Sequence, residues 1–518
     1  MNEESKAVQN EENSSDIPLP GRDYSLAPHD ADEIEVDPTI MDNLWARELL
    51  ELGVDERNAT DENLHGLRSL AIDETPERLR RALNDMQVEI HKLPDEDQRG
   101  HTKGLALGSM YVQSLAFRLK FLRCVQFDAK MAAFRYCSSL NMLWEIFGDV
   151  ALMRRLYITD LGEEEMEYMK EGQFQVLPGR DSLGRRIVVF NMRQPQKKYS
   201  MDSMFKVYVY CLNAVVSEDI STQKHGIVYI GILQKSEHLA NNERQASMDL
   251  HRVHKMYAGT PLYWGGAHLC CPDSPLFRIV TAVFLAWIGQ EGRKVLRVHR
   301  GNRIECNYSL RSFGIPVEDM PQMHTGEIKT KNHMRLVKVR GDMDKWEIEQ
   351  KERFKSRRRS KSAPETIKPF PGIECPEVDY VVLPYLRNID GTQNNHPGNV
   401  AFRKVMANNE GFKIFSRDHD GSEFAKRSRL FQVVDEVIFD ACVQGLQFLI
   451  YDKENGYYKE VVEQDVLRIN IEQVMRRYRH QLRSQSDSNS REGKASLGNS
   501  YRQGFDLTSN EDMDLCGC

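Results

Sequence analysis

The sequence predicts an α/β fold in the middle of the chain, with helices before it and a smaller α+β domain after it. Three short apolar stretches rich in β-branched residues are typical of strands buried on both faces, at 225–233, 262–270 and 294–299. Helical patterns separate these strands, at about 243–257 and 276–288. Because strands and helices alternate, we expect a sheet that is at least partly parallel.

Helical patterns also precede the strands, in four segments. The second segment opens with Thr75 and Pro76, a capping residue followed by a proline in the first turn. Two short strands around the turn PGRDSLG and a further helix then lead into the sheet. The expected helices are 41–52, 75–93, 104–124, 128–147 and 203–217, and the expected hairpin strands are 173–177 and 186–192.

Composition divides the 518-residue chain into six regions. Residues 1–40 hold eleven acidic side chains against Lys6 and Arg22, which is typical of a disordered tail. A helical region at 41–148 and a sheet-containing lobe at 165–326 follow. A basic linker at 341–377 begins as a surface helix over 342–354. The last two regions are a small domain at 378–483 and a Ser-rich, Asn-rich tail at 484–518 that we expect to be disordered.

The composition favours a cytoplasmic protein. The first residues have neither an apolar core nor a basic flank, so they do not resemble a signal peptide. The ten cysteines form no CxxC pair, which favours a reduced compartment. The most apolar run, 276–288, is too short to cross a bilayer and contains Arg278. A net charge of −7 does not single out nucleic acid as a partner.

Two segments resemble the CRAL-TRIO family of lipid-binding proteins. FLRCVQFDAKMAAFRYCSSLNMLW (121–144) resembles the end of the family's small helical lobe, and PGRDSLGRRIVVF (178–190) resembles its first sheet strands. The order of the later strands and of the apolar helix 276–288 is also similar, and GIPVEDMPQMHTG (314–326) occupies the place of the closing element. The resemblance covers about residues 78–326. It implies a small helical lobe, a mixed sheet flanked by helices and an apolar cavity.

The resemblance implies that helix 276–288 is a gate over a cavity that holds a hydrophobic ligand, and that this helix can meet a membrane. In the helical pattern Arg278 and Thr281 form a narrow polar stripe, and apolar residues cover the rest. An ordinary core helix is the alternative. We expect the cavity wall to come from the gate, from helix 203–217 and from strand 225–233, through Tyr208, Cys211, Leu212, Val228, Ile230, Phe277, Val280 and Phe284.

No catalytic or metal-binding motif stands out. His251 and His254 have a spacing that suits two ligands of a metal, but no third ligand accompanies them, so a solvated helix face is the simpler interpretation. Motifs of nucleotide-binding loops, serine hydrolases and zinc proteases do not occur. We therefore expect a binding protein without a metal or an organic cofactor, rather than an enzyme.

The linker and the final residues contain candidate modification sites. RSKSAP (359–364) resembles the phosphorylated ligand of 14-3-3 proteins, which makes Ser360 and Ser362 candidate phosphorylation sites. An electrostatic membrane patch, a nuclear import signal and a plain solvated linker are the alternatives. Cys516 and Cys518 form a Cys-x-Cys ending that makes them candidate lipidation sites, although an unmodified tail is the simpler interpretation.

The C-terminal domain carries the distinctive segment DGTQNNHPGNVAFRKVM (390–406). This segment resembles the signature of an uncharacterised domain family of microbial algae. Its Asn and Gly residues either build a turn and a cap or form a polar site for an unknown protein partner. Helix 429–444, strand 446–451 and helix 462–482 are expected to follow.

Three classes of function remain open on sequence alone. The first is binding or transfer of a lipid by a peripheral membrane protein. The second is a signalling adaptor regulated through the basic linker, and the third is a nucleic-acid-associated factor.

Overall fold

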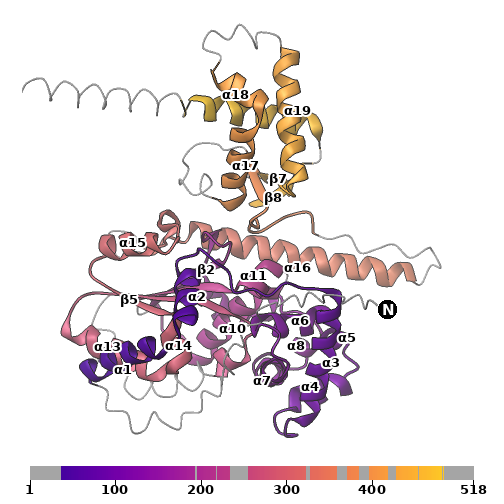
Figure 1. Cartoon of the computed structure of the whole chain (residues 1–518). Helices are drawn as coiled ribbons and strands as arrows, with labels where there is room; N and C mark the ends of the chain where they lie inside the picture. The colour runs from indigo at the N-terminus through magenta and orange to yellow at the C-terminus, as the bar shows by residue number, and fades with distance from the viewer. Residues whose placement is uncertain are drawn as a thin grey trace, which may run out of the picture. The chain divides into compact units, whose positions relative to one another are not determined.

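The computed structural model shows two compact units. It describes residues 37–192, 195–217, 219–233, 255–322, 327–358, 370–383, 396–417, 427–452, 454–461, 463–480 and 482. Unit 1 comprises Met1–Leu156 and Phe190–Ser309, and unit 2 comprises Tyr157–Val189 and Leu310–Cys518. Figure 1 shows the elements of both units.

The larger sheet has five strands in the order β1-β2-β3-β4-β5. The boundary between the units falls inside β2, after Val189. Strand β3 pairs in parallel with β4, which pairs in parallel with β5, as the alternation of strands and helices predicts. The strands are β1 (Phe174–Arg180), β2 (Arg186–Met192), β3 (Ile227–Leu233), β4 (Trp264–Cys271) and β5 (Leu296–Arg300).

Six helices of unit 1 form a helical lobe with its own core. Rings of Phe117, Phe121 and Tyr136 meet edge to face or tilted at its centre. The predicted cap is present, because the Thr75 hydroxyl accepts a hydrogen bond from the Arg78 amide at 3.2 Å. The helices are α3 (Pro76–Lys92), α4 (Arg99–Ala106), α5 (Met110–Gln113), α6 (Leu115–Cys124), α7 (Ala129–Phe147) and α8 (Val150–Met153).

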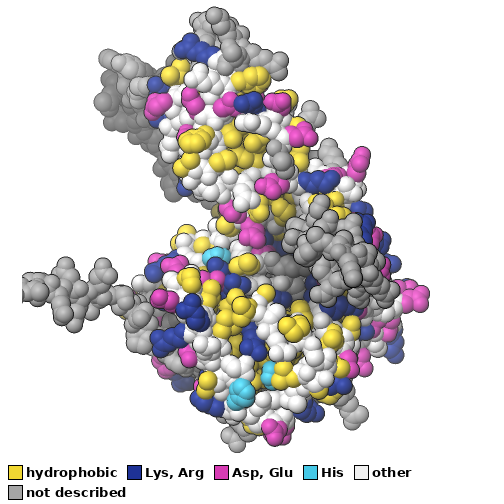
Figure 2. Space-filling model, turned by 90° about the vertical axis from the view of Figure 1, so that its right-hand side faces the viewer, with side chains coloured by type: hydrophobic (Ala, Val, Ile, Leu, Met, Phe, Trp, Pro, Cys, Tyr) yellow, Lys and Arg dark blue, Asp and Glu magenta, His cyan; other side chains and the backbone are white. Residues whose placement is uncertain are grey.

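The single helix expected over 104–124 is wrong, since the structure has three helices there. Gly108 takes φ +66°, a left-handed conformation that ends α4 at low steric cost. The hydroxyl of Ser109 then caps α5, and that of Ser114 caps α6. On the side of unit 1 that carries these helices, Figure 2 shows hydrophobic side chains at the surface between Lys and Arg.

The first two helices pack beside the sheet. Helix α1 (Pro38–Glu51) lies side by side with α13 (Pro275–Trp287) and contacts α14 (Gly289–Val295), and α2 (Val54–Leu64) packs on β4 (Figure 1). Unit 1 also contains α10 (Met201–Ser217), α11 (Ile220–His225) and α15 (Arg303–Ser312), whose last three residues fall in unit 2.

Unit 2 contains a three-stranded mixed sheet. Strand β6 (Tyr380–Leu383) is parallel to β7 (Gln447–Asp452), which is antiparallel to β8 (Tyr457–Glu460). Its apolar core joins this sheet to the helices after β6. The helices of the unit are α9 (Glu163–Glu171), α16 (Lys331–Arg358), α17 (Pro397–Asn408), α18 (Glu410–Arg417), α19 (Arg427–Val443) and a helix over 464–480.

The structure confirms the α/β class and the parallel part of the larger sheet. Helix α16 begins eleven residues before the surface helix expected at 342–354 and extends past it. Most of the helix expected at 243–257 lies outside the described residues, although 255–259 is helical. The tails expected at 1–40 and 484–518 also lie mostly or wholly outside them.

Candidate functional site

Helix α13 is the element that the sequence singles out, and its inner face packs on the sheet. Phe277, Ala282 and Leu285 are buried in a cluster that includes residues of β3, β4 and β5. Thr281 is also buried, and its hydroxyl donates a hydrogen bond of 2.9 Å to the Arg278 carbonyl oxygen within the helix. The expected polar stripe is therefore split, since Thr281 faces the core.

The outer face of α13 is apolar as well. The exposed fractions of Leu276, Ile279 and Val283 are 39%, 49% and 43%. These residues recur at spacings of three and four, so they share one face of the helix. Arg278 is exposed but points away from this face, and it pairs with Asp273 at 3.2 Å. A helix that is apolar on both faces yet lies at the surface is unusual in a monomeric soluble protein.

The structure brings three of the eight predicted lining residues together. Phe277, Val280 and Phe284 belong to the cluster beneath α13. Val228 and Ile230 are fully buried, but they point to the opposite face of β3 from Leu233, which joins that cluster. Gly231 supports this assignment, because a side chain there would meet Met192 and Leu269 of the same cluster.

The other three predicted residues lie on α10. Cys211 and Leu212 are buried, and Tyr208 is half-buried with its ring edge-on to Phe190 at 5.1 Å between centroids. Among the described residues, the cluster beneath α13 does not include these three. The eight residues are thus divided between the α13 cluster, the opposite face of β3 and helix α10.

Helix α1 completes the α13 cluster, and sequence reasoning missed this. Met41 is fully buried there, and Leu44 and Trp45 pack against it. The Trp45 indole donates a hydrogen bond of 2.8 Å to the Arg293 carbonyl oxygen. Glu48 occupies the next position on the face of α1 that carries Met41, Leu44 and Trp45. A charged residue on an otherwise apolar face was the one sign in the sequence that this face is buried against a partner of opposite charge.

Glu48 lies on this stripe because it pairs with Arg293. The guanidinium donates to both carboxylate oxygens, at 2.6 Å each, and its third nitrogen donates to the Leu285 carbonyl oxygen at 2.8 Å. Both side chains are about nine-tenths buried. Because Leu285 belongs to α13, this ion pair ties α1, α13 and α14 together.

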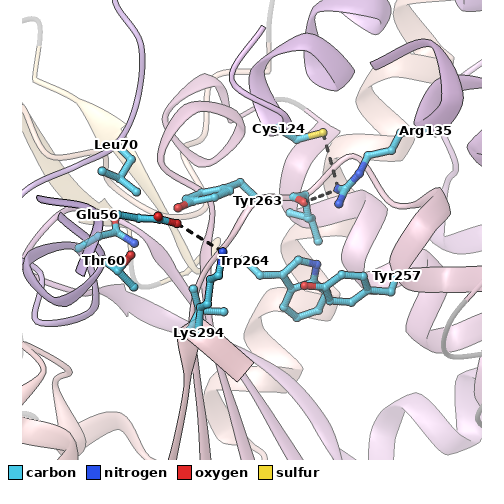
Figure 3. A pocket seen from close by; sticks show the side chains of 12 residues that line it. Glu56, Thr60, Leu70, Cys124, Arg135, Tyr257, Tyr263, Trp264 and Lys294 are labelled. Carbon is cyan, nitrogen blue, oxygen red and sulfur yellow. Dashed lines mark hydrogen bonds and ion pairs between the residues drawn. The ribbon is translucent and has the colours of Figure 1, made fainter. Parts of the chain in front are cut away.

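A small pocket opens beside α2 and β4, as Figure 3 shows. Arg135 donates to the Leu262 carbonyl oxygen at 3.0 Å, Glu56 pairs with Lys294 at 3.3 Å, and Tyr257 stacks on Trp264. Its volume of about 40 Å³ holds three waters or so, since each needs ~10–15 Å³. An acyl chain does not fit, and none of the eight predicted lining residues contributes to it.

A buried histidine pair lies on neighbouring strands of the sheet. His268 of β4 and His299 of β5 stack, with Nδ1 and Nε2 3.0 Å apart. Burial, aided by the charge of Arg297, lowers the pKa of His299 to about 4. Among the described residues no group of three or more His, Cys, Asp or Glu side chains could hold a metal ion.

The pair predicts a loss of stability in mild acid. His299 titrates near pH 6.5 when unfolded, so between pH 6.5 and 4 the unfolded state binds more protons than the folded one. The contribution of His299 to the free energy of unfolding then falls by about 2 kcal/mol from pH 7 to pH 5. Hydrogen exchange of the β5 amides, which lie in unit 1, measures this for wild type and His299→Gln at both pH values. The variant loses less stability on acidification, and a His91→Gln control at an exposed site behaves as wild type.

The signature of the C-terminal domain is largely structural where it is described. Gly398 lets the first turn of α17 approach the backbone of β6, because a side chain there would collide with the Tyr380 carbonyl oxygen. The Asn399 side chain accepts a hydrogen bond of 2.8 Å from the Val382 amide. Phe402 is fully buried, edge-on to Phe448. These residues join a helix to a sheet, as the turn-and-cap alternative expects.

Several candidate residues lie outside the described parts of the chain. They are Ser360 and Ser362 of the linker, Cys516 and Cys518 of the tail, the histidines at 251 and 254, and residues 390–395 of the signature. Within the described residues, no helix is both long and apolar enough to cross a membrane. The chain matches no protein-family model, and no curated protein is significantly similar to it.

Proposed function

We propose that the chain binds a hydrophobic lipid beneath α13 and exchanges it with membranes. The observation that carries this proposal is the two-sided apolar character of α13. Its inner face belongs to the cluster on the sheet, and its outer face presents Leu276, Ile279 and Val283 to solvent. A cover that must meet both an acyl chain and a bilayer needs apolar residues on both sides.

Lipid uptake in this proposal requires α13 to move. Phe277, Val280 and Phe284 fill the space between the helix and the strands. A lipid that displaces the helix would replace these contacts with contacts to its chains, at roughly 0.8 kcal/mol per buried methylene. Because a bilayer offers the chains a similar free energy, such a protein lowers the barrier to leaving the membrane and does not hold the lipid irreversibly.

The Glu48–Arg293 ion pair restricts the movement of α13 at its C-terminal end. Arg293 follows α13 closely in the chain, and it is held by α1 and by the Leu285 carbonyl oxygen. The C-terminal end of α13 is therefore anchored. Its N-terminal end follows Pro272 and begins at Pro275, and the ion pair described there, between Arg278 and Asp273, joins two exposed side chains. We propose that the helix swings from its N-terminal end.

Transfer of labelled lipid between vesicles tests this function with the full chain. The probes are pyrene-labelled phosphatidylcholine and phosphatidylinositol. We expect Ile279→Asp/Val283→Asp to slow transfer by about ten-fold, because two charges replace aliphatic groups that must enter the interface. Both side chains are about half exposed, so the fold tolerates the change.

The matched control is Ile304→Asp, which changes an exposed aliphatic residue of α15 in the same unit. It should transfer lipid at the wild-type rate. The proposal fails if the wild-type chain neither transfers either probe nor carries any lipid that mass spectrometry detects after purification from cells.

A further inference from the structure

Three buried cysteines with free thiols lie close together in unit 1. Cys270 and Cys271 are the last two residues of β4, and Cys306 lies near the start of α15. Cys271 belongs to the cluster beneath α13. Because successive side chains of a strand point to opposite faces, Cys270 points to the other face of the sheet.

The thiols of Cys270 and Cys306 meet beside strand β5. Cys270 is paired in register with His299 of β5, and the Cys306 thiol donates a hydrogen bond of 3.5 Å to the His299 carbonyl oxygen. A hydrogen bond also joins the two thiols. A disulfide between them therefore requires two sulfurs that are already in contact to close to a bond of about 2.05 Å.

The surroundings make Cys306 the more reactive of the two thiols. The hydrogen bond with Cys270 lowers the pKa of the Cys306 thiol, and so does the hydrogen bond with the Cys271 backbone, whereas burial acts in the opposite direction. The contact with Cys306, together with burial, raises the pKa of Cys270. Burial, aided by the charge of Asp97, also raises the pKa of Cys137 to about 12. Because the thiolate is the nucleophile, Cys306 is the thiol that attacks an oxidant first.

Cys306 faces inward from a helix that lies at the surface. Ile304 and Tyr308, two positions to either side of it, are on the opposite face of α15 and are exposed by 68% and 79%. Helix α15 has ten residues, and a helix of that length depends on its packing, so it can open locally. Hydrogen peroxide is a small molecule, and a brief opening of this kind admits it to the thiol pair.

We propose that hydrogen peroxide joins Cys306 and Cys270 in a reversible disulfide that ties α15 to β4. The Cys306 thiolate attacks peroxide: an S–O bond forms, the O–O bond breaks, and the hydroxide that leaves takes a proton to become water. Cys270 then attacks the sulfenic acid of Cys306, so that the S–S bond forms, the S–O bond breaks and a second water leaves. A small thiol restores both cysteines by exchange, and a lipid beneath α13 is not required.

Peptide mass spectrometry of the full chain tests the proposal. The chain is treated with hydrogen peroxide, its remaining thiols are alkylated, and it is digested without reductant. The peroxide dose is raised until Cys442, an exposed thiol, is oxidised. We expect a peptide pair joined through Cys270 and Cys306 that dithiothreitol separates, while Cys137 stays reduced. We also expect the α15 amides of unit 1 to exchange hydrogen about ten-fold more slowly in the oxidised chain.

Two variants of β4 separate the roles of its adjacent cysteines. Cys270→Ala should form no disulfide with Cys306 and should leave a sulfenic acid there that dimedone labels, whereas the matched control Cys271→Ala should form the disulfide as wild type does. The proposal is overturned if wild-type Cys306 stays reduced at a dose that oxidises Cys442, if Cys306 is oxidised without joining Cys270, or if α15 exchanges equally fast in both forms. The wild-type result decides the matter even where a variant does not fold.

Discussion

Arg293→Met lowers the free energy of unfolding of unit 1 by about 3–5 kcal/mol. The substitution leaves Glu48 about nine-tenths buried without the guanidinium that binds both of its oxygens. It also removes the donor to the Leu285 carbonyl oxygen. Native-state hydrogen exchange of β4 amides measures this loss within unit 1, which avoids treating a two-unit chain as a single cooperative transition.

Two further variants test whether the buried ion pair is the cause of this loss. In Glu48→Leu/Arg293→Met, most of the lost stability returns, because an apolar pair replaces an ion pair of similar volume. Arg47→Ala, which removes an exposed ion pair with Glu51 on the same helix, costs no more than about 0.5 kcal/mol. If Arg293→Met cost as little as Arg47→Ala, the pair would not hold α1 in place.

Asp181→Ala destabilises unit 2 by a similar amount, about 3–5 kcal/mol. Asp181 lies in the turn between β1 and β2, and its carboxylate accepts from the Leu183 and Arg185 amides and from the Arg185 side chain at 2.6 Å. Both side chains are almost fully buried. Removing the carboxylate leaves a buried guanidinium and two amides that must find other partners.

Hydrogen exchange of the β1 amides, which lie wholly in unit 2, reports this change. Glu349→Gln is the control, since Glu349 pairs with Arg353 on an exposed face of α16 in the same unit. Asp181→Asn retains one acceptor oxygen for the turn amides and should fall between wild type and Asp181→Ala. If Asp181→Asn destabilised unit 2 and Asp181→Ala did not, the carboxylate would not be what holds this turn.

The elements that could be predicted from the sequence are those with an uninterrupted apolar pattern. The predicted bounds of β3, α7 and α13 agree with the structure within two residues, because β3 is a continuous apolar run and the apolar residues of the two helices follow the helical period. The prediction of a single helix over 104–124 was wrong for a local reason. Its apolar pattern continues through Gly108, but a left-handed glycine and two serine caps end and restart the helix.

The candidate site could be predicted only in part. Strand β3 is apolar on both faces, so its pattern cannot show which residues face α13, and the apolar character of Val228 and Ile230 alone does not place them in the cavity wall. The pattern predicts Thr281 in a polar stripe with Arg278, because its internal hydrogen bond to the Arg278 carbonyl oxygen is not visible in a pattern. The contact between α1 and α13 joins residues far apart in sequence, which no local pattern reports.

The same long separation has a consequence for how the chain matures on the ribosome. Glu48 and Arg293 are 245 positions apart, so α1 leaves the exit tunnel long before its partner is made. At ~5–20 residues per second, the apolar side of α1 waits for about 12–50 seconds without its packing surface. During that interval Met41 and Trp45 are available to chaperones or to aggregation. A fragment that begins after α2 would avoid this wait, but its Arg293 would have no carboxylate to meet.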